Sequence, residues 1–352
     1  MGQRASSNTK GPSFSGRAAV IERLRARTGA AGNFSAPCIP ALLDHYFDKI
    51  VQLFASIDRP LHPGEVDVIR STLHAKVEEG FAISPYARFV LAYEPSETRP
   101  GSVTCSISIV APTLAQQYDE WLRQTAGEEP FGEHADAKVM HVACALPHAN
   151  RGPVLDVGAG AGRNSVELAK LGLVVHALEP QAAMARLLRE KAAREQLSIE
   201  VMEAELLADA AALARDHYSL IVLSEVTPHF SLRDAEVALA KVALALRPGG
   251  TLLFNAFVSK PGSEPELVAQ QAAQGVWSTF FTSDDLTRIA RELSLVQEDD
   301  CACIAYEQAH LPSGAWPPTS WYENWANGHN LYSMASEDPP PIELRWLEYR
   351  RR

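Results

Sequence analysis

The spacing of apolar residues divides the chain into two regions of different character. Residues 38–112 carry apolar positions at helical spacing, followed by two short alternating runs that are separated by turn residues. The expected elements are helices over 39–57 and 63–79 and strands over 89–93 and 103–110. This pattern predicts a small N-terminal α+β unit, which we expect to act as a cap domain. Residues 1–37 are rich in Gly, Ser, Asn and Pro and predict a disordered tail.

Residues 113–352 alternate between short apolar runs and amphipathic segments. Strands are expected at 154–157, 174–178, 198–202, 220–223, 251–257, 301–306 and 342–349. Helices are expected at 114–124, 135–146, 163–171, 181–195 and 233–246, and a further one begins at 283. Strand–helix alternation is typical of parallel sheets with crossover helices, so we predict an α/β fold with a seven-stranded, mostly parallel sheet. The last two strands are expected to pair antiparallel around a long insertion, 310–341.

Composition narrows the classes of protein that fit. The net charge of −11 argues against a nucleic-acid binder. No apolar run reaches 18 residues and the start lacks the apolar stretch of a signal peptide, so we expect a cytoplasmic protein that does not act at a membrane. The tail holds six basic residues against one acidic, a pattern also seen in transit peptides. Cys301 and Cys303 are expected on one face of a strand as small core residues, and no metal site is predicted.

A glycine-rich loop is the strongest chemical signal. The run VLDVGAGAGRN covers 154–164, and its glycines connect an apolar strand to a helix. Such a loop lets the backbone approach a ligand at the carboxyl edge of a parallel sheet. A dinucleotide fingerprint needs glycine where Arg163 stands. Asp156 would repel a pyrophosphate, whereas its charge suits a cationic ligand such as S-adenosylmethionine (SAM).

An acidic residue follows the next expected strand. Glu179 lies 21 residues after Gly158. Its carboxylate can accept hydrogen bonds from both ribose hydroxyls of an adenosine ligand. A solvated glutamate at a strand end is the alternative interpretation.

Together these motifs resemble those of the class I SAM-dependent methyltransferases, which have a Rossmann-like fold. The resemblance covers about 113–352 and implies that Glu179 binds ribose. It also implies an acid beside the adenine, with Glu205 the better match and Glu203 the second. The G-R-N-S stretch is similar to the tellurite-resistance-type and type 11/12-like small-molecule branch. The SAM-binding residues expected from these motifs are Asp156, Gly158, Ala159, Gly160, Gly162, Asn164, Glu179, Pro180, Glu205, Leu206, Ser224 and Tyr118. For Tyr118, amphipathic core packing is an equally open interpretation.

The methyl acceptor is expected at the same edge of the sheet. His229 follows the fourth strand of the alternating region and can take a proton near neutral pH, and Glu225 is a second candidate base. Either residue can also be purely structural. The insertion places Trp316, Trp321 and Trp325 within ten residues, and aromatic side chains can hold a cation or an apolar acceptor. We therefore predict Trp316, Trp321, Tyr322 and Trp325 as acceptor-binding residues, with packing on the sheet as the alternative.

These observations favour an enzyme that transfers methyl from SAM to a small-molecule acceptor, with a sulfur nucleophile as one option. S-adenosylhomocysteine (SAH) would be the product. Three alternatives stay open: a peptide or protein methyltransferase that recognises its acceptor through the N-terminal unit, a non-catalytic SAM-binding protein, and a nicotinamide dehydrogenase, which Arg163 disfavours. The sequence does not determine the oligomeric state.

Overall fold

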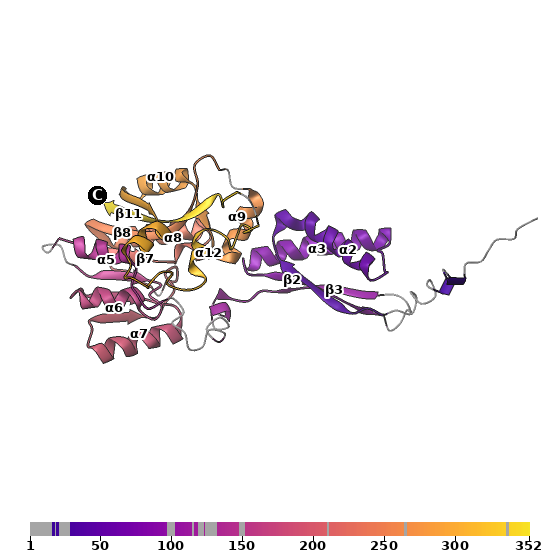
Figure 1. Ribbon diagram of the computed structural model, residues 1–352, viewed down its shortest axis with the longest axis horizontal. Helices are drawn as coiled ribbons and strands as arrows, with labels where there is room; N and C mark the ends of the chain where they lie inside the picture. The colour runs from indigo at the N-terminus through magenta and orange to yellow at the C-terminus, as the bar shows by residue number, and fades with distance from the viewer. Residues whose placement is uncertain are drawn as a thin grey trace, which may run out of the picture. The chain divides into compact units, whose positions relative to one another are not determined.

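The chain forms two compact units in the computed structural model, Met1–Pro112 and Thr113–Arg352 (Figure 1). The structure describes residues 16–17, 19–20, 29–96, 103–114, 116–118, 123, 132–147, 152–209, 211–263, 266–335 and 338–352. Each unit has its own hydrophobic core.

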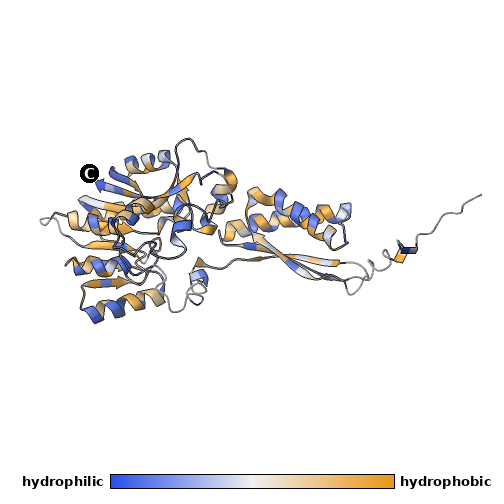
Figure 2. Cartoon of the chain, viewed as in Figure 1, coloured by the Kyte–Doolittle hydropathy of each residue, from blue (hydrophilic) through white to orange (hydrophobic). Residues whose placement is uncertain are grey.

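The N-terminal unit is a three-stranded sheet with two helices on one face. Its elements are β1 (Gly32–Pro37), η1 (Pro40–Leu42), α2 (Leu43–Ser56), α3 (Pro63–Ile83), β2 (Arg88–Pro95) and β3 (Val103–Val110). The predicted hairpin is confirmed, because β2 pairs antiparallel with β3. Phe89 and Leu91 of β2 are fully buried with Phe54 and Leu73 of the helices. Figure 2 shows the matching mixture of apolar and polar sides along α2 and α3.

The prediction of a disordered tail over 1–37 is wrong for its last six residues. Gly32–Pro37 forms β1, which pairs antiparallel with β2. Phe34 lies opposite Leu91 in this pairing, and its ring packs 5.9 Å from that of Phe89. Backbone pairing and one apolar face order this segment in spite of its composition. Most of the remaining tail falls outside the described residues.

The second unit alternates strands and helices. Its first half contains α5 (Ala137–Ala145), β4 (Val154–Val157), α6 (Arg163–Lys170), β5 (Val175–Leu178), α7 (Ala182–Glu195), β6 (Ile199–Met202), β7 (Tyr218–Leu223), η3 (Thr227–His229) and α8 (Leu232–Ala245). Its second half contains β8 (Leu246–Ser259), α9 (Leu267–Ala273), η4 (Gln274–Val276), β9 (Phe280–Phe281), α10 (Ser283–Glu292), β10 (Leu295–Ala302), α11 (Cys303–His310), α12 (Tyr322–Ala326) and β11 (Ile342–Arg351). The expected helix over 114–124 is described only in part.

The predicted mostly parallel sheet is confirmed, although the described residues form eight strands in it rather than seven. Its strand order is β10-β11-β8-β7-β4-β5-β6, and the short β9 pairs with β8 outside this path. The pairs β8–β7, β7–β4, β4–β5 and β5–β6 are parallel, whereas β11 is antiparallel to both of its neighbours. The chain leaves β4 toward β5 and later returns to the other side of β4 as β7. This reversal creates a switch point at the carboxyl end of β4, where open α/β sheets bind ligands.

Both faces of the central sheet are covered. Leu220 and Val222 of β7 belong to a core shared with α5, α6, α11 and α12, whereas Ile221 and Leu223 face α8 and α10. The strands are accordingly apolar along most of their length (Figure 2). Strands buried on both faces read as continuous apolar runs, which explains why the sequence identified them.

The strand predicted over 301–306 is wrong in extent. β10 covers Leu295–Ala302, and Cys303 begins α11. The acidic residues over 298–300 hid this strand from the apolar pattern. They are tolerated because, within the described part of the chain, β10 is an edge strand that pairs with β11 alone. Cys303 is fully buried as expected of a core residue, although it lies in a helix.

A buried carboxylate attaches α11 to the rest of the unit. Glu307 accepts hydrogen bonds from the backbone N–H groups of Ala137 (2.6 Å) and Lys138 (3.2 Å), at the start of α5. It also accepts one from Nε1 of Trp346 (2.9 Å), a fully buried residue of β11. One side chain therefore satisfies three donors from two distant elements.

Replacing Glu307 should destabilise this unit strongly. Glu307→Ala leaves three buried donors without an acceptor, so we expect a loss of about 3 kcal/mol or more in the free energy of unfolding. Urea denaturation measures it, with the exposed Glu323→Ala as the matched control. A loss below about 1 kcal/mol would show that Glu307 does not carry this junction.

Candidate functional site

The glycine loop after β4 has a backbone that only glycine adopts readily. Gly158, Gly160 and Gly162 have φ values of +68°, +55° and +95°. A Cβ on Gly162 would lie 2.3 Å from Cδ1 of Leu188, on α7. Gly158 is exposed between buried neighbours, so its backbone is open to a ligand. Ala159 is buried and packs against α7.

Glu179 lies directly beside this loop, as the sequence predicted. One carboxylate oxygen accepts a hydrogen bond from the N–H of Gly160 (2.7 Å), and the other accepts one from the N–H of Gln181 (2.8 Å). Burial raises the pKa of Glu179. Each oxygen keeps a second lone pair, so the carboxylate can still accept two ribose hydroxyls. Pro180 is exposed next to it.

Asp156 lies beneath the loop rather than at its surface. Its side chain is buried and accepts a hydrogen bond from Oγ of Ser165 (2.6 Å) at the start of α6. Burial raises the pKa of Asp156 to about 7. Asp156 was predicted to bind SAM. From this buried position, its carboxylate can influence a ligand by its negative charge and by supporting the glycine loop.

A buried group of three charges lies next to the loop. The guanidinium of Arg163 bonds Asp136 through Nη1 (2.5 Å) and Glu225 through Nη2 (2.9 Å), and all three side chains are nearly buried. Burial raises the pKa of Glu225, and Arg163 opposes this increase. With both carboxylates ionised, the group has one surplus negative charge. We call these three residues the acidic triad.

Two residues predicted to bind SAM hold Asp136 in place. Asn164 donates from Nδ2 to Asp136 (2.9 Å) and accepts the N–H of Asp136 with Oδ1 (2.9 Å). Ser224 donates from Oγ to the same carboxylate (2.7 Å). Sequence reasoning missed Asp136, because an isolated acid before a helix is a common cap. In the sequence, Arg163 is informative only because it stands where a dinucleotide fingerprint needs glycine.

The turn after β7 brings the candidate base into an aromatic cluster. Nε2 of His229 lies 3.1 Å from Oη of Tyr118. The ring of Trp277 lies 5.6 Å from His229 and stacks on Tyr118 at 6.1 Å and 13°. Burial lowers the pKa of His229 to about 4, so its imidazole is neutral at neutral pH. Trp277 was not predicted.

The aromatic residues of the insertion mainly pack against the sheet. Tyr322 and Trp325 are buried in the core beside β7 and β8, and Trp316 and Trp321 pack against the same core. Trp325 meets Phe257 edge-on at 5.4 Å and donates from Nε1 to the backbone oxygen of Trp277 (2.8 Å). The packing alternative therefore describes most of this segment.

Of the two predicted SAM-binding residues that follow β6, one is exposed and the other is buried. Glu205 is exposed, whereas Leu206 is buried in the core with α8. Glu203 pairs with Arg189 of α7 (3.2 Å). Glu205 thus stays the better candidate for the acid beside the adenine.

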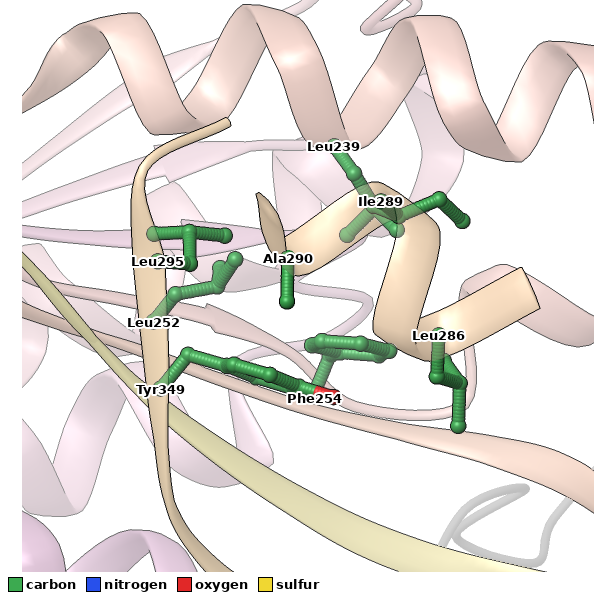
Figure 3. A pocket seen from close by; sticks show the side chains of 8 residues that line it. All are labelled: Leu239, Leu252, Phe254, Leu286, Ile289, Ala290, Leu295 and Tyr349. Carbon is green, nitrogen blue, oxygen red and sulfur yellow. The ribbon is translucent and has the colours of Figure 1, made fainter. Parts of the chain in front are cut away.

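A small cavity elsewhere in this unit does not suit a polar ligand. It lies among α8, α10 and the neighbouring strands (Figure 3). Its lining is Leu239, Leu252, Phe254, Leu286, Ile289, Ala290, Leu295 and Tyr349. Only the Tyr349 side chain has an oxygen, so the cavity is a packing defect of the core.

SAM fits the polar groups at the carboxyl edge. Its ribose hydroxyls match the carboxylate of Glu179, its adenosine can approach the exposed Gly158, and its positive charges suit the acidic triad and Asp156. The described residues hold no cluster of three or more His, Cys, Asp or Glu side chains that could bind a metal. The expectation of no metal site stays a prediction. No described helix is long and apolar enough to cross a membrane.

Alanine at Gly162 should destabilise the loop more than alanine at a comparable glycine. Gly162→Ala combines a strained φ with a clash against Leu188, whereas Gly172→Ala has a strained φ of +77° and no atom within 4 Å. We expect a loss of about 1 kcal/mol for Gly172→Ala and at least about 2 kcal/mol for Gly162→Ala in urea denaturation. Equal losses would contradict the packing described for the loop.

Comparison with known proteins agrees with this geometry. A family model described as a methyltransferase domain matches residues 154–250. A ubiquinone biosynthesis O-methyltransferase of Methylobacterium sp. (strain 4-46) is 27% identical over 172 residues. That alignment covers 46% of this chain and 66% of the relative.

Two solved structures are similar at low sequence identity. A phosphoethanolamine N-methyltransferase 2 of Haemonchus contortus has a TM-score of 0.51 and 14% identity, over 71% of this chain and 63% of that chain. A geranyl diphosphate C-methyltransferase of Streptomyces coelicolor A3(2) has a TM-score of 0.46 and 15% identity, over 61% of this chain and 79% of that chain. The first likeness shows a shared fold. Taken with the glycine loop, the methyltransferase-domain match over residues 154–250 and the methyltransferase relative support a class I SAM-dependent methyltransferase.

Proposed function

We propose that this protein transfers a methyl group from SAM to a small-molecule acceptor at the carboxyl edge of β4, β7 and β8. The observation that carries the proposal is the contact between Glu179 and the loop glycine Gly160, which puts a carboxylate able to accept ribose hydroxyls beside the glycine loop at the switch point of the sheet. The curated relative, whose name places it in ubiquinone biosynthesis, supports a small acceptor. The likeness to the tellurite-resistance-type branch remains a prediction.

The residues of this chain would hold the donor through charge and hydrogen bonds. Glu179 would bind the ribose, Gly158 would meet the adenosine, and Glu205 would lie toward the adenine. When bound, SAM supplies an electrophilic methyl group on a positively charged sulfur. The acidic triad and Asp156 offer this charge a negative, desolvated environment, where electrostatic attraction is much stronger than in water.

Glu225 is better suited to this electrostatic role than to that of a base. Its carboxylate bonds Arg163, and its backbone N–H donates to Oδ1 of Asn255 (2.6 Å). It is also a non-glycine residue with φ of +60°, a strained backbone that fits a fixed position. His229 is neutral, so its imidazole has a free site for a proton, but the burial that lowers its pKa also makes it a weaker base than an ordinary histidine. A sulfur acceptor, which needs no base, has no such support in the described contacts.

Removing the Glu179 carboxylate should weaken donor binding. Glu179→Ala deletes the acceptor of two ribose hydrogen bonds, so we expect calorimetry to show SAH affinity at least about tenfold lower. The matched control is Glu190→Ala on α7, whose side chain is exposed. A thermal melt checks that the loop survives the change. Unchanged SAH affinity in Glu179→Ala, or binding of NADH in preference to SAH, would contradict the proposal.

SAM affinity should rise between pH 6 and pH 8. Burial raises the pKa of Asp156 to about 7 and also raises that of Glu225, so these groups are partly protonated at pH 6. A cationic ligand favours their ionised forms, and binding at low pH must therefore release protons. We expect about a tenfold gain per released proton across this range. Calorimetry in two buffers with different ionisation enthalpies measures the release.

SAH is the control for this pH effect, because it lacks the sulfonium charge and should show a shallower dependence. Asp156→Asn should make the pH dependence of SAM affinity shallower than in the unmodified protein. An SAM affinity that stays constant or falls as the pH rises would rule out the electrostatic role of these carboxylates.

A further inference from the structure

Three residues near the turn after β7 each have a buried side-chain polar atom without a hydrogen-bond partner. These atoms are Nδ1 of His229, Nε1 of Trp277 and Oγ1 of Thr279. The rings of His229 and Trp277 are 5.6 Å apart, and the N–H of Thr279 donates to the backbone oxygen of Pro228, next to His229 (3.3 Å). Buried polar groups in native proteins are almost always satisfied, so these three atoms need partners that the described contacts do not supply.

These atoms also lie at the correct edge of the sheet. His229 follows the carboxyl end of β7, and Thr279 precedes β9, which pairs with the carboxyl end of β8 through Phe280 and Phe257. This is the edge at which the glycine loop and Glu179 lie, because β4, β7 and β8 run parallel. A molecule that meets the three atoms would therefore be on the side of the sheet where the donor is expected.

Contacts of its backbone and of its ring face hold Trp277 in position, and neither uses the indole N–H. It is a non-glycine residue with φ of +55°, and its backbone oxygen accepts the hydrogen bond from Trp325. Its ring stacks on Tyr118, which also contacts His229. The insertion thus fixes Trp277 through the backbone and leaves its indole N–H unpaired. Strained backbone held by its surroundings is typical of ligand sites.

The chemistry of the three atoms limits what they can bind. The indole N–H of Trp277 can only donate, whereas Oγ1 of Thr279 can donate or accept. Nδ1 of His229 accepts a proton when Nε2 carries the ring hydrogen toward Tyr118. Burial is the sole cause of the lowered pKa of His229, with no contribution from a neighbouring charge. The surroundings therefore suit an uncharged molecule with oxygen atoms and a flat face.

We propose that His229, Trp277 and Thr279 form the acceptor subsite and that it takes an uncharged hydroxylated ring of the phenol class. This inference rests on the proposed methyltransferase function. The acceptor oxygen would form its bond to the methyl carbon as the carbon–sulfur bond of the donor breaks, with that bond's electron pair remaining on sulfur. The hydroxyl proton would pass to Nδ1 of His229. Trp277 would donate to a second oxygen of the ring, and Thr279 would orient the reacting hydroxyl.

The test measures binding of simple neutral phenols by calorimetry with SAH at saturation. The probes are phenol, catechol and hydroquinone, and phosphoethanolamine is the charged comparison. The variants are Thr279→Val, which keeps the shape of the side chain, and Trp277→Phe, which keeps an aromatic ring. We expect each variant to weaken catechol binding at least about fivefold while SAH affinity stays unchanged.

Thermal stability separates this role from a structural one. Thr279→Val removes a hydroxyl with no partner, so its Tm should stay equal to or exceed that of the unmodified protein. Thr227→Val is the matched control, because Oγ1 of Thr227 donates to the backbone oxygen of Asn255 (2.5 Å) in the buried part of the same turn. This control should lower the Tm by about 2–4 °C.

Three results would overturn the proposal. They are phenol binding that both variants leave unchanged, binding of phosphoethanolamine but of no phenol, and a Tm loss in Thr279→Val as large as that in Thr227→Val. Failure of the unmodified protein to bind SAH is a different result, since it removes the proposed function itself. A fourth result, SAH binding without binding of any phenol, also overturns the subsite but leaves the proposed function standing.

Discussion

The architecture of the site depends on one buried cation. Arg163 stands at the first position of α6 and bonds two carboxylates that come from distant parts of the chain, Asp136 before α5 and Glu225 after β7. Moving three charges out of water costs several kcal/mol for each ion, and only close pairing offsets this cost. The three segments therefore have to meet in one arrangement, which also fixes the end of the glycine loop.

This arrangement gives one edge of the sheet a negatively charged side and a neutral side. On the side of the loop, Asp156 and the acidic triad supply negative charge where a cationic donor is expected. On the side of His229 and Trp277, the rings are neutral and the buried unpaired atoms are hydrogen-bond donors and a proton acceptor. Different groups would thus match the charged methyl donor and the neutral acceptor that we propose. Methyl transfer needs the two held in fixed orientation, and a rigid sheet edge provides that.

The sequence was sufficient for features that are local in the chain. The loop over 154–164, Glu179 and the parallel strands follow from apolar runs, glycine positions and short spacings, and the structure places them as predicted. Long-range partners could not be read in this way. Asp136 is 27 residues from Arg163, and nothing in either neighbourhood signals the pair.

Other differences have equally specific causes. β1 was missed because its order comes from pairing with β2, and β10 was misplaced because an edge strand tolerates acidic residues. Trp277 and Thr279 carry no motif, and their unpaired atoms are visible only once the chain is folded. The tryptophans of the insertion were conspicuous in the sequence, yet their main contacts are with the core.

The most direct test of the account is a crystal structure of the protein with SAH and catechol bound. The account predicts both ribose hydroxyls on the carboxylate of Glu179, with the sulfur facing the ring of catechol and a catechol oxygen within hydrogen-bond distance of Nδ1 of His229. SAH bound away from the glycine loop would contradict the assignment of the donor site. Catechol bound away from His229, Trp277 and Thr279 would contradict the division of the edge into a charged and a neutral half.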